Sequence, residues 1–361
     1  MKTKRILNSI STMIVILSIT IMGCKKDLDT IQPNPEGGQL LAGPKASAAG
    51  SIVSSGTVIN GVFYGGIALN SANSVTLKVT ITTAGTYNIS SNTVNGYNFS
   101  KSGSFTSTGT QYVTLPGNGT PLATGINTFT VTFGTNCTFA VVVVNNAPIV
   151  QITCNQSYTY YEVANQKTQK VWLDRNLGAN RIAQSATDYQ SYGSLFQWGR
   201  LADDHQCINW SDSYSGTAIN GVTTTTSTSN TPGNSLFVKT VQSPYDWKVP
   251  QNNNLWQGVS GINNPCPSGY RLPTSSELTA EVSSWTSKNT AGAFGSPLKW
   301  TVAGYRDFPD GEVYDSGNSG AYWSSTVSNT SKAMVMWFST SGGYTISDFR
   351  AVGYSVRCIK N

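Results

Sequence analysis

The chain has 361 residues, of which only 11% are charged, and a formal net charge of +6 with a single histidine. Ordinary soluble domains are about 25% charged, while the aromatic content of 11% argues against a disordered chain. The single His205 excludes a zinc site built from several histidines, and any histidine-dependent mechanism must use it.

Residues 1–23 have the pattern of a signal peptide. Three cations in the first five residues precede an apolar run over residues 10–21, which is short for a membrane-spanning helix. The run ends in Ile21-Met22-Gly23-Cys24, which resembles the lipobox of bacterial lipoproteins, with Met at the second position as a departure. The resemblance implies cleavage before Cys24, lipid modification of that cysteine and anchoring to a membrane outside the cytoplasm. A plain signal peptide or an anchor helix is the alternative.

Residues 24–45 combine Pro, Gly and mixed charge, which predicts a flexible tether. Lys25-Lys26-Asp27 resembles the export signals of some Bacteroidetes lipoproteins. We therefore expect an outer-membrane lipoprotein at the cell surface, with the periplasmic face as the alternative. Loss of residues 1–23 removes three cations and no acid, which lowers the formal charge from +6 to +3. No cluster of Lys and Arg remains, so nucleic acid is not expected as a partner.

Residues 46–150 predict an all-β sandwich as the N-terminal domain. No Asp or Glu occurs over residues 46–148, and apolar residues alternate with Thr over residues 75–81 and 129–133 and lead into the apolar run at 139–144. The segments are separated by the turn sequences Ala84-Gly85, Asn95-Gly96, Ser102-Gly103, Pro116-Gly117-Asn118-Gly119 and Thr124-Gly125. Short strands of this kind are typical of an antiparallel sandwich with Thr on the solvent face.

Residues 61–144 also carry segments similar to a known module. The sequences VTLKVTITTAGTYNIS, NGYNFSKSGSF and CTFAVVVV resemble an immunoglobulin-like β-sandwich module of Bacteroidetes surface proteins. The resemblance implies a spacer or presenting domain without chemistry of its own. In that module a cysteine near the start pairs with the one in the CTF segment, but the start of this segment has none. Cys137 has therefore lost its partner or uses another.

Residues 151–361 predict an α+β, loop-rich domain that contains all nine Trp. One helix is expected over residues 275–285, because Thr274 or Ser275 can cap it and Glu277 lies in its first turn. A second, interrupted by Gly193, is expected over residues 189–201. The low-complexity residues 211–236 predict a mobile loop.

Five blocks of this domain, in order, resemble a known family. They are VWLDRNLGA (171–179), FQWGR followed by ADDHQ (196–206), NPCPSGYRLPTSSEL (264–278), AGYRDFPDGEVYDSGNSGAYWSST (303–326), and Phe349-Arg350 with GYSVRCIKN. Together they resemble the Fibrobacter succinogenes major paralogous domain. The family implies a C-type-lectin-like fold, related in shape to sulfatase-modifying-factor domains, with its ends tied by a disulfide. Most motif residues are expected to support the fold, and Arg350 and Arg357 are expected to hold loop carbonyls or carboxylates such as Asp174.

Acylation of Cys24 would leave five cysteines, an odd number for an oxidising compartment. Cys266 and Cys358 are the best pair, because they join the CPSGY turn to the final strand. Cys154 pairs either with Cys207, within this domain, or with Cys137, across the two domains, and one thiol stays free in either case. Since no CxxC motif occurs, a zinc site is not expected.

Residues suited to catalysis or metal binding are few. His205 and Cys207 could form a nucleophilic pair, but a disulfide would consume the thiol. Acids cluster at Asp203-Asp204 and at Asp307, Asp310, Glu312 and Asp315. Asp307, Asp310 and Asp315 are candidate ligands for Ca²⁺, which takes several oxygens, although Asp310-Gly311 is read more simply as a hairpin turn. The EPN and QPD motifs of calcium-dependent lectins are absent from this domain, so no cofactor is expected, with calcium as the alternative.

Residues 320–350 have the mixture of Tyr, Trp, Ser, Asn and Gly that suits adaptable recognition. Trp337 and Phe338 point to opposite faces of a strand, so one of them is expected in the core. The candidate ligand-binding residues are Tyr322, Trp337, Phe338, Tyr344, Asp348 and Phe349.

The sequence as a whole predicts a lipid-anchored, non-catalytic binding or adhesion protein whose lectin-like domain recognises a glycan or a surface protein. One alternative is a cell-envelope enzyme, either a hydrolase or a protein like sulfatase-modifying factors. The other is a structural component of the surface layer or of fimbriae. A glycosidase needs two carboxylates across a cleft, and nothing in the sequence identifies such a pair.

Overall fold

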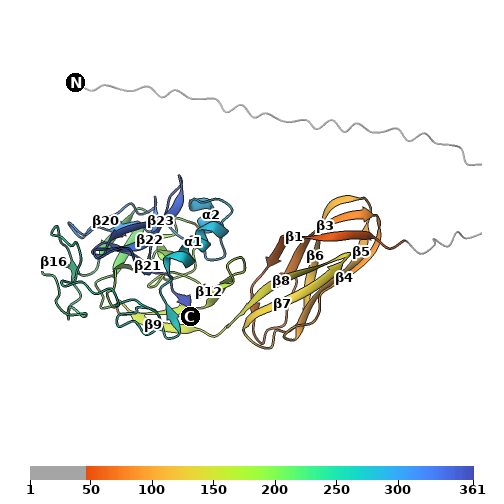
Figure 1. Cartoon of the computed structure of the whole chain (residues 1–361). Coiled ribbons are helices and arrows are strands. Elements are labelled where there is room, and N and C mark those ends of the chain that lie inside the picture. The colour runs from red at the N-terminus through yellow and green to blue at the C-terminus, as the bar shows by residue number, and fades with distance from the viewer. Residues whose placement is uncertain (1–45) are drawn as a thin grey trace, which may run out of the picture. The chain divides into compact units, whose positions relative to one another are not determined.

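The computed structural model describes residues 46–361 and is mostly β, with 44% strand and 6% helix (Figure 1). The predicted signal peptide (1–23), the predicted tether (24–45) and Cys24 lie outside the described residues. Among residues 46–361, no helix has the length and apolar character needed to cross a membrane.

The N-terminal domain consists of two sheets that share one hydrophobic core. The five-stranded sheet has the order β1-β3-β6-β5-β4, and the three-stranded sheet has the order β2-β8-β7. The strands are β1 (Ala49–Asn60), β2 (Phe63–Tyr64), β3 (Ser74–Thr83), β4 (Gly85–Ser90), β5 (Tyr97–Phe105), β6 (Gly109–Gly119), β7 (Gly125–Phe133) and β8 (Thr135–Val144). The predicted sandwich class is consistent with this arrangement.

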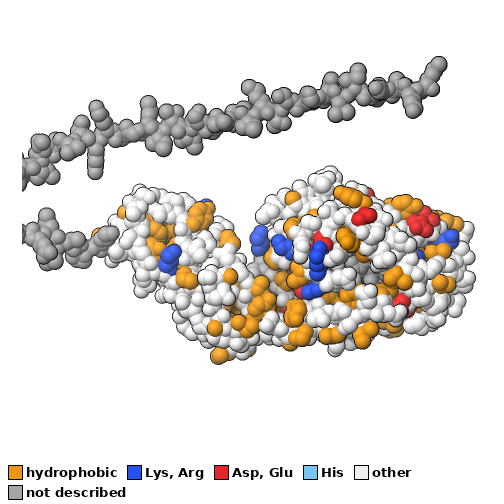
Figure 2. Space-filling view, turned by 180° about the vertical axis from the view of Figure 1, so that it is seen from behind, with side chains coloured by type: hydrophobic (Ala, Val, Ile, Leu, Met, Phe, Trp, Pro, Cys, Tyr) orange, Lys and Arg blue, Asp and Glu red, His pale blue; other side chains and the backbone are white. Residues whose placement is uncertain are grey.

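Alternation of apolar and polar side chains explains the sandwich core. Along β3, Val75, Leu77, Val79 and Ile81 are buried, while the intervening positions are more exposed, as expected for a strand with one wet face. The predicted strands at 75–81, 129–133 and 139–144 are confirmed by β3, β7 and β8. Figure 2 shows the surface of this domain as mostly uncharged, with little blue and no red, in agreement with its lack of Asp and Glu.

Two of the predicted turns in this domain are wrong. Ser102-Gly103 lies inside β5 and residues 116–119 end β6, where they pair with neighbouring strands. A Cβ atom at Gly103 would lie 2.6 Å from the Tyr87 hydroxyl oxygen, so a larger residue there would displace the Tyr87 ring. Asn95-Gly96 does form a tight turn, with φ of 49° and 83°, which suits a hairpin connection.

The C-terminal domain is built on a four-stranded sheet, β11-β12-β25-β18, and a seven-stranded sheet. The larger sheet has the order β20-β19-β24-β21-β22-β23, and β13 pairs with β24. Its strands are β13 (Leu195–Gln197), β19 (Tyr305–Arg306), β20 (Val313–Tyr314), β21 (Gly320–Val327), β22 (Lys332–Phe338), β23 (Gly343–Phe349) and β24 (Gly353–Ser355). The others are β9 (Ile149–Thr153), β10 (Gln156–Tyr160), β11 (Glu162–Asn165), β12 (Lys170–Leu173), β14 (Ile208–Asp212), β15 (Ser215–Ala218), β16 (Val222–Thr223), β17 (Phe237–Val238), β18 (Tyr270–Arg271) and β25 (Ile359–Lys360).

The predicted helix at 275–285 is confirmed as α1 (Ser275–Ser284). The Thr274 side chain accepts a hydrogen bond from the Glu277 backbone, and the Glu277 carboxylate accepts one from the Thr274 backbone, which completes a capping box. Helix α1 packs against β21, β22 and β23, so it covers one face of the larger sheet (Figure 1). A second short helix, α2 (Thr290–Gly295), was not expected from the sequence.

The helix expected over residues 189–201 is wrong. Only the 3₁₀ turn Tyr189–Ser191 forms, because Gly193 takes a left-handed conformation with φ of 73° and residues 195–197 pair with β24 instead. Residues 211–236, expected to be a mobile loop, contain β15 and β16. Their backbone is held by buried donors, such as Arg200 to the Asn234 and Leu236 carbonyls at 2.8 Å.

Two disulfides and two arginines hold the C-terminal domain together. Cys154 is bonded to Cys207 and Cys266 to Cys358, while Cys137 is buried and free. Of the two pairings considered for Cys154, the one with Cys207 is therefore correct and the one with Cys137 is wrong. Arg357 is fully buried and donates to the Asn176 side chain and to the Leu298 carbonyl, and Arg350 donates to the Asn329 carbonyl, among other contacts. Both bind loop acceptors, as the sequence predicted.

Candidate ligand-binding surface

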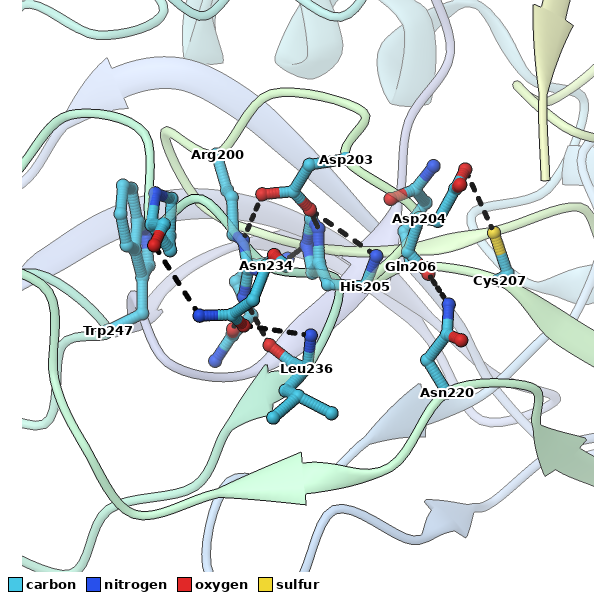
Figure 3. Close-up of polar contacts among 12 residues, drawn as sticks. Arg200, Asp203, Asp204, His205, Gln206, Cys207, Asn220, Asn234, Leu236 and Trp247 are labelled. Atoms are coloured by element: carbon cyan, nitrogen blue, oxygen red, sulfur yellow. Dashed lines mark hydrogen bonds and ion pairs between the residues drawn. The ribbon is translucent and has the colours of Figure 1, made fainter.

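The His205 region is a closed network of hydrogen bonds. Figure 3 shows Asp203 between Arg200 and His205, with 2.8 Å from Arg200 Nε to Oδ2 and 2.6 Å from His205 Nδ1 to Oδ1. His205 Nε2 accepts a hydrogen bond from the Gln197 backbone at 3.0 Å. Cys207 is in a disulfide. This nucleophile–base pair is therefore not available, because the imidazole has no free nitrogen and the cysteine no thiol.

Burial keeps the imidazole of His205 neutral. Its environment lowers the pKa of His205 to about 3, first through burial and then through the positive charge of Arg200, against the opposing effect of Asp203. A neutral ring with Nδ1–H facing Asp203 and Nε2 facing a backbone N–H uses both nitrogens. The network thereby fixes residues 197–207 against the segment that contains Asn234 and Leu236.

We expect His205 to make the C-terminal domain sensitive to acid. An unfolded chain binds a proton at His205 below about pH 6.5, whereas the folded state does not until about pH 3, so stability falls as the pH decreases between these values. The slope is up to about 1.4 kcal/mol per pH unit. We expect the free energy of unfolding of a His205→Asn variant to depend less on pH than that of the parent. Between about pH 6.5 and 4.5 the variant should lose about 2–3 kcal/mol less than the parent, as measured by urea unfolding followed by Trp fluorescence.

The buried Asp246 has the opposite effect in the same range, because burial raises its pKa to about 6. Its carboxylate therefore takes up a proton in the folded state before it does so in the unfolded chain, and stability rises as the pH falls. Since both proteins contain Asp246, its contribution cancels in the comparison. An identical pH dependence in the parent and the His205→Asn variant would contradict the assignment.

The carboxylates of the three candidate calcium residues each accept hydrogen bonds from neighbouring groups of the protein. Asp310 accepts hydrogen bonds from the Glu312 backbone at 3.0 Å and from the Tyr314 hydroxyl at 2.7 Å, within the predicted hairpin formed by β19 and β20. Asp307 accepts from the Phe308 backbone, and Asp315 from the Ser319 hydroxyl. Within residues 46–361, the one group of three candidate metal ligands is Cys154, Asp204 and Cys207. Its two sulfurs form a disulfide, so they cannot act as thiolate ligands.

Two of the candidate ligand-binding aromatics belong to the core. Phe338 is fully buried and Tyr322 is 1% exposed, and both pack against α1 and its neighbours. The Tyr322 hydroxyl is fully used, because it donates to the Thr301 carbonyl at 2.9 Å and accepts from the Thr301 backbone at 3.1 Å. The expectation that one of Trp337 and Phe338 lies in the core is confirmed for Phe338.

Trp337 and Tyr344 form an exposed pair at the edge of the larger sheet. They are opposed across β22 and β23, and their rings lie 5.3 Å apart with an interplanar angle of 38°. Tyr344 is 50% exposed and Trp337 is partly exposed. Strand β23 is the last strand of the sheet order. The pair therefore presents two mutually inclined aromatic rings at the solvent-exposed edge of the sheet.

Two half-buried residues of β23 lie on the same side of the strand as Tyr344. Tyr344, Ile346 and Asp348 point to the same face, since side chains alternate along a strand. Asp348 accepts a hydrogen bond from the Tyr354 hydroxyl at 2.5 Å, and Tyr354 contacts Tyr305 at a ring distance of 6.1 Å. This places Tyr305 of β19 on the face that carries Tyr344.

A second group of aromatic residues comes from separate segments. Tyr245, Phe308 and Phe349 contact one another, with ring distances from 4.6 to 5.9 Å. Like Trp337 and Tyr305, Phe308 and Phe349 pack half-buried at the rim of one core cluster. We call the following set the aromatic surface: Tyr245, Tyr305, Phe308, Trp337, Tyr344 and Phe349. Half-exposed apolar side chains are common at binding sites.

Sequence reasoning identified Trp337, Tyr344 and Phe349 but not Tyr245, Tyr305 or Phe308. The latter three come from segments about 30 to 100 residues away along the chain, and the pairing of β19 with β24 brings Tyr305 and Phe308 close to β24. Comparison of the chain with protein-family models, with curated proteins and with solved structures found no match.

Proposed function

We propose that this protein is a lipid-anchored, non-catalytic binding protein of the bacterial outer surface. In this proposal Cys24 carries the lipid, the sandwich is a spacer, and the C-terminal domain is a lectin-like module of the Fibrobacter succinogenes paralogous family. The lipobox-like sequence at residues 21–24 and the five motif blocks support these assignments. The ligand is a glycan, bound at the aromatic surface.

One observation carries the proposal, namely the exposed pair of Trp337 and Tyr344. Aromatic rings of this size are costly to leave in water and are enriched where partners bind. The apolar C–H face of a sugar ring can stack on one of these aromatic rings. The hydroxyl of Tyr344 can make a hydrogen bond at the rim of the pair.

The test is glycan binding by the chain without residues 1–23 and with Cys24→Ser. We expect Trp337→Ala and Tyr344→Ala each to weaken binding about tenfold or more, since truncation of a central aromatic contact costs about 1.4–2 kcal/mol. Tyr344→Phe keeps the ring and should retain most of the affinity. Tyr112 of the sandwich is exposed to 66%, so Tyr112→Ala is the matched control and should bind normally.

Three other results would reject the proposal. Binding to no glycan at all would remove the lectin-like function. Turnover of a glycan that is lost on substitution of the acids at 307–315 would favour an enzyme. Self-assembly of the chain into filaments or sheets, without ligand binding, would favour the structural alternative.

A further inference from the structure

A small cavity opens beside the Cys154–Cys207 disulfide, and it shares no residue with the aromatic surface. Its volume is about 100 Å³, which is room for a few water molecules or for one end of a larger molecule. Its walls come from the β9–β10 hairpin, the residues after β12, the 3₁₀ turn at 189–191 with the residues after it, and β14 with the residue after β15. We call it the polar cavity.

Close packing keeps the floor of the polar cavity in place. Gly178 and Gly193 both have left-handed backbone conformations, with φ of 75° and 73°. A Cβ atom at Gly178 would overlap the Ser194 hydroxyl, and one at Gly193 would overlap the Leu177 carbonyl. The Trp210 indole Nε1 donates to the Gly193 carbonyl at 2.7 Å, which ties β14 to this floor. The cavity is therefore built into the fold, and its shape exists before a ligand binds.

Polar groups that line the cavity lack strong partners. Ser194 is 3% exposed, and the one hydrogen-bond contact of its hydroxyl among residues 46–361 is the Cys154 sulfur, at 3.8 Å. Sulfur is a weak partner, whereas a buried hydroxyl usually has a strong one. The side-chain amides of Asn180 and Gln190 form no hydrogen bond with any group of the described residues. These three side chains therefore offer both donors and acceptors to a ligand.

No charged side chain lines the polar cavity. Two charged residues contact the lining, and each already has protein partners. Asp204 accepts a hydrogen bond from the Cys154 backbone at 2.9 Å, and Arg175, which donates to the Asn180 carbonyl at 3.2 Å, forms an ion pair with Asp174 at 2.8 Å. A charged ligand would lose its hydration in the cavity without gaining a counter-ion, which is unfavourable. The lining therefore favours a neutral ligand.

The apolar part of the lining consists of the indole of Trp210 and the side chains of Ile208 and Ile219. The C–H groups of a sugar pack well on an indole ring, while each of its hydroxyls can both donate and accept a hydrogen bond. A side-chain amide also donates and accepts, so Asn180 and Gln190 are complementary to neighbouring hydroxyls. An apolar wall with a few unpaired polar groups is the usual composition of a small-molecule site.

We propose that the polar cavity is a second binding site, which takes the edge of one uncharged sugar residue. The hydroxyls of the sugar bind Ser194, Asn180 and Gln190, and its C–H groups pack on Trp210. Because the volume is small, the rest of the ligand lies outside the cavity. This inference goes beyond the proposed function, since it stands even if the aromatic surface binds no glycan.

The test titrates the chain without residues 1–23 and with Cys24→Ser with the methyl glycosides of glucose, galactose and mannose, and follows binding by NMR of the sugar. We expect at least one glycoside to bind with a Kd of about 1 mM or below. Gln190→Ala should weaken this binding about three- to tenfold, which is the effect of one lost hydrogen bond. Ile219 lines the cavity and is 56% exposed, so Ile219→Trp should block its mouth and abolish binding. Ile262 is 62% exposed and lies outside the lining, so Ile262→Trp is the matched control and should bind normally.

The outcomes separate this site from the aromatic surface. Trp337→Ala should leave glycoside binding at the cavity unchanged. Binding that is lost in Trp337→Ala but kept in Ile219→Trp would overturn the second site and leave the proposed function intact. Glycerol, glucosamine or glucuronate bound as tightly as the best glycoside would overturn the assignment to an uncharged sugar. Absence of binding by all three glycosides, at ten times the expected Kd, would reject the site.

Discussion

Replacement of Cys266 and Cys358 by alanine will lower the free energy of unfolding of the C-terminal domain by about 4–5 kcal/mol. The two cysteines are 92 residues apart, and their Cα atoms lie 5.9 Å from each other. A crosslink over this length removes much of the entropy of the unfolded chain. It also joins the turn before β18 to the residue that precedes β25, which are neighbouring strands. The chain-entropy model gives the Cys154–Cys207 crosslink about 4 kcal/mol.

Tryptophan fluorescence makes this measurement specific to one domain. All nine Trp lie between residues 172 and 323 or at 337, so none is in the sandwich. A reductant breaks both disulfides of the parent, so urea unfolding of the reduced parent should show a larger loss than the double substitution. The double variant should respond to the reductant only through Cys154–Cys207. Cys137→Ala is the control, because this cysteine is free and packs in the sandwich core, and it should leave the fluorescence transition in place. A double variant as stable as the parent would contradict the prediction.

Replacement of Glu281 by alanine should destabilise the same domain by about 3–5 kcal/mol. Glu281 is fully buried in α1 and accepts hydrogen bonds from Asn165 Nδ2 at 2.7 Å, Trp300 Nε1 at 3.1 Å and Trp285 Nε1 at 3.2 Å. Each buried donor that loses its acceptor costs about 1–3 kcal/mol, and the missing side chain leaves a cavity.

Glu281→Gln is the matched variant for this prediction. Glutamine has the same shape and keeps one acceptor oxygen, so the loss should be roughly half as large or less. Because two of the three donors are indoles, fluorescence spectra of the folded variants should also change. Equal stability of the alanine variant and the parent would contradict the prediction. It would mean that Trp285, Trp300 and Asn165 form other hydrogen bonds when the carboxylate is absent.

Local signals account for the parts of the fold that the sequence predicted correctly. Helix α1 has its Thr274 cap, its Glu277 and its apolar stripe within a dozen residues, and the alternation in β3 fits within seven. The helix expected at 189–201 failed for the opposite reason. Residues 195–197 are captured by β24, which lies more than 150 residues further along the chain, and a long-range contact of this kind overrides local propensity.

The binding site was predictable only in part for the same physical reason. Trp337 and Tyr344 are seven residues apart in one hairpin, so a single segment indicated both. Tyr322 lies in the same segment, residues 320–350. It is buried because it packs against Thr301 and α1, and both lie outside that segment. Glu281 carried no sequence signal for its role, since its partners Asn165 and Trp300 come from other parts of the chain.

The lack of acids in the sandwich has a consequence for any experiment that varies pH. Residues 46–150 contain no carboxyl side chain and no imidazole, so between about pH 4 and 7 this domain exchanges almost no protons with the solvent on unfolding. Its stability should therefore be flat over that interval. The protons that residues 46–361 take up on unfolding in this interval are therefore bound by residues 151–361.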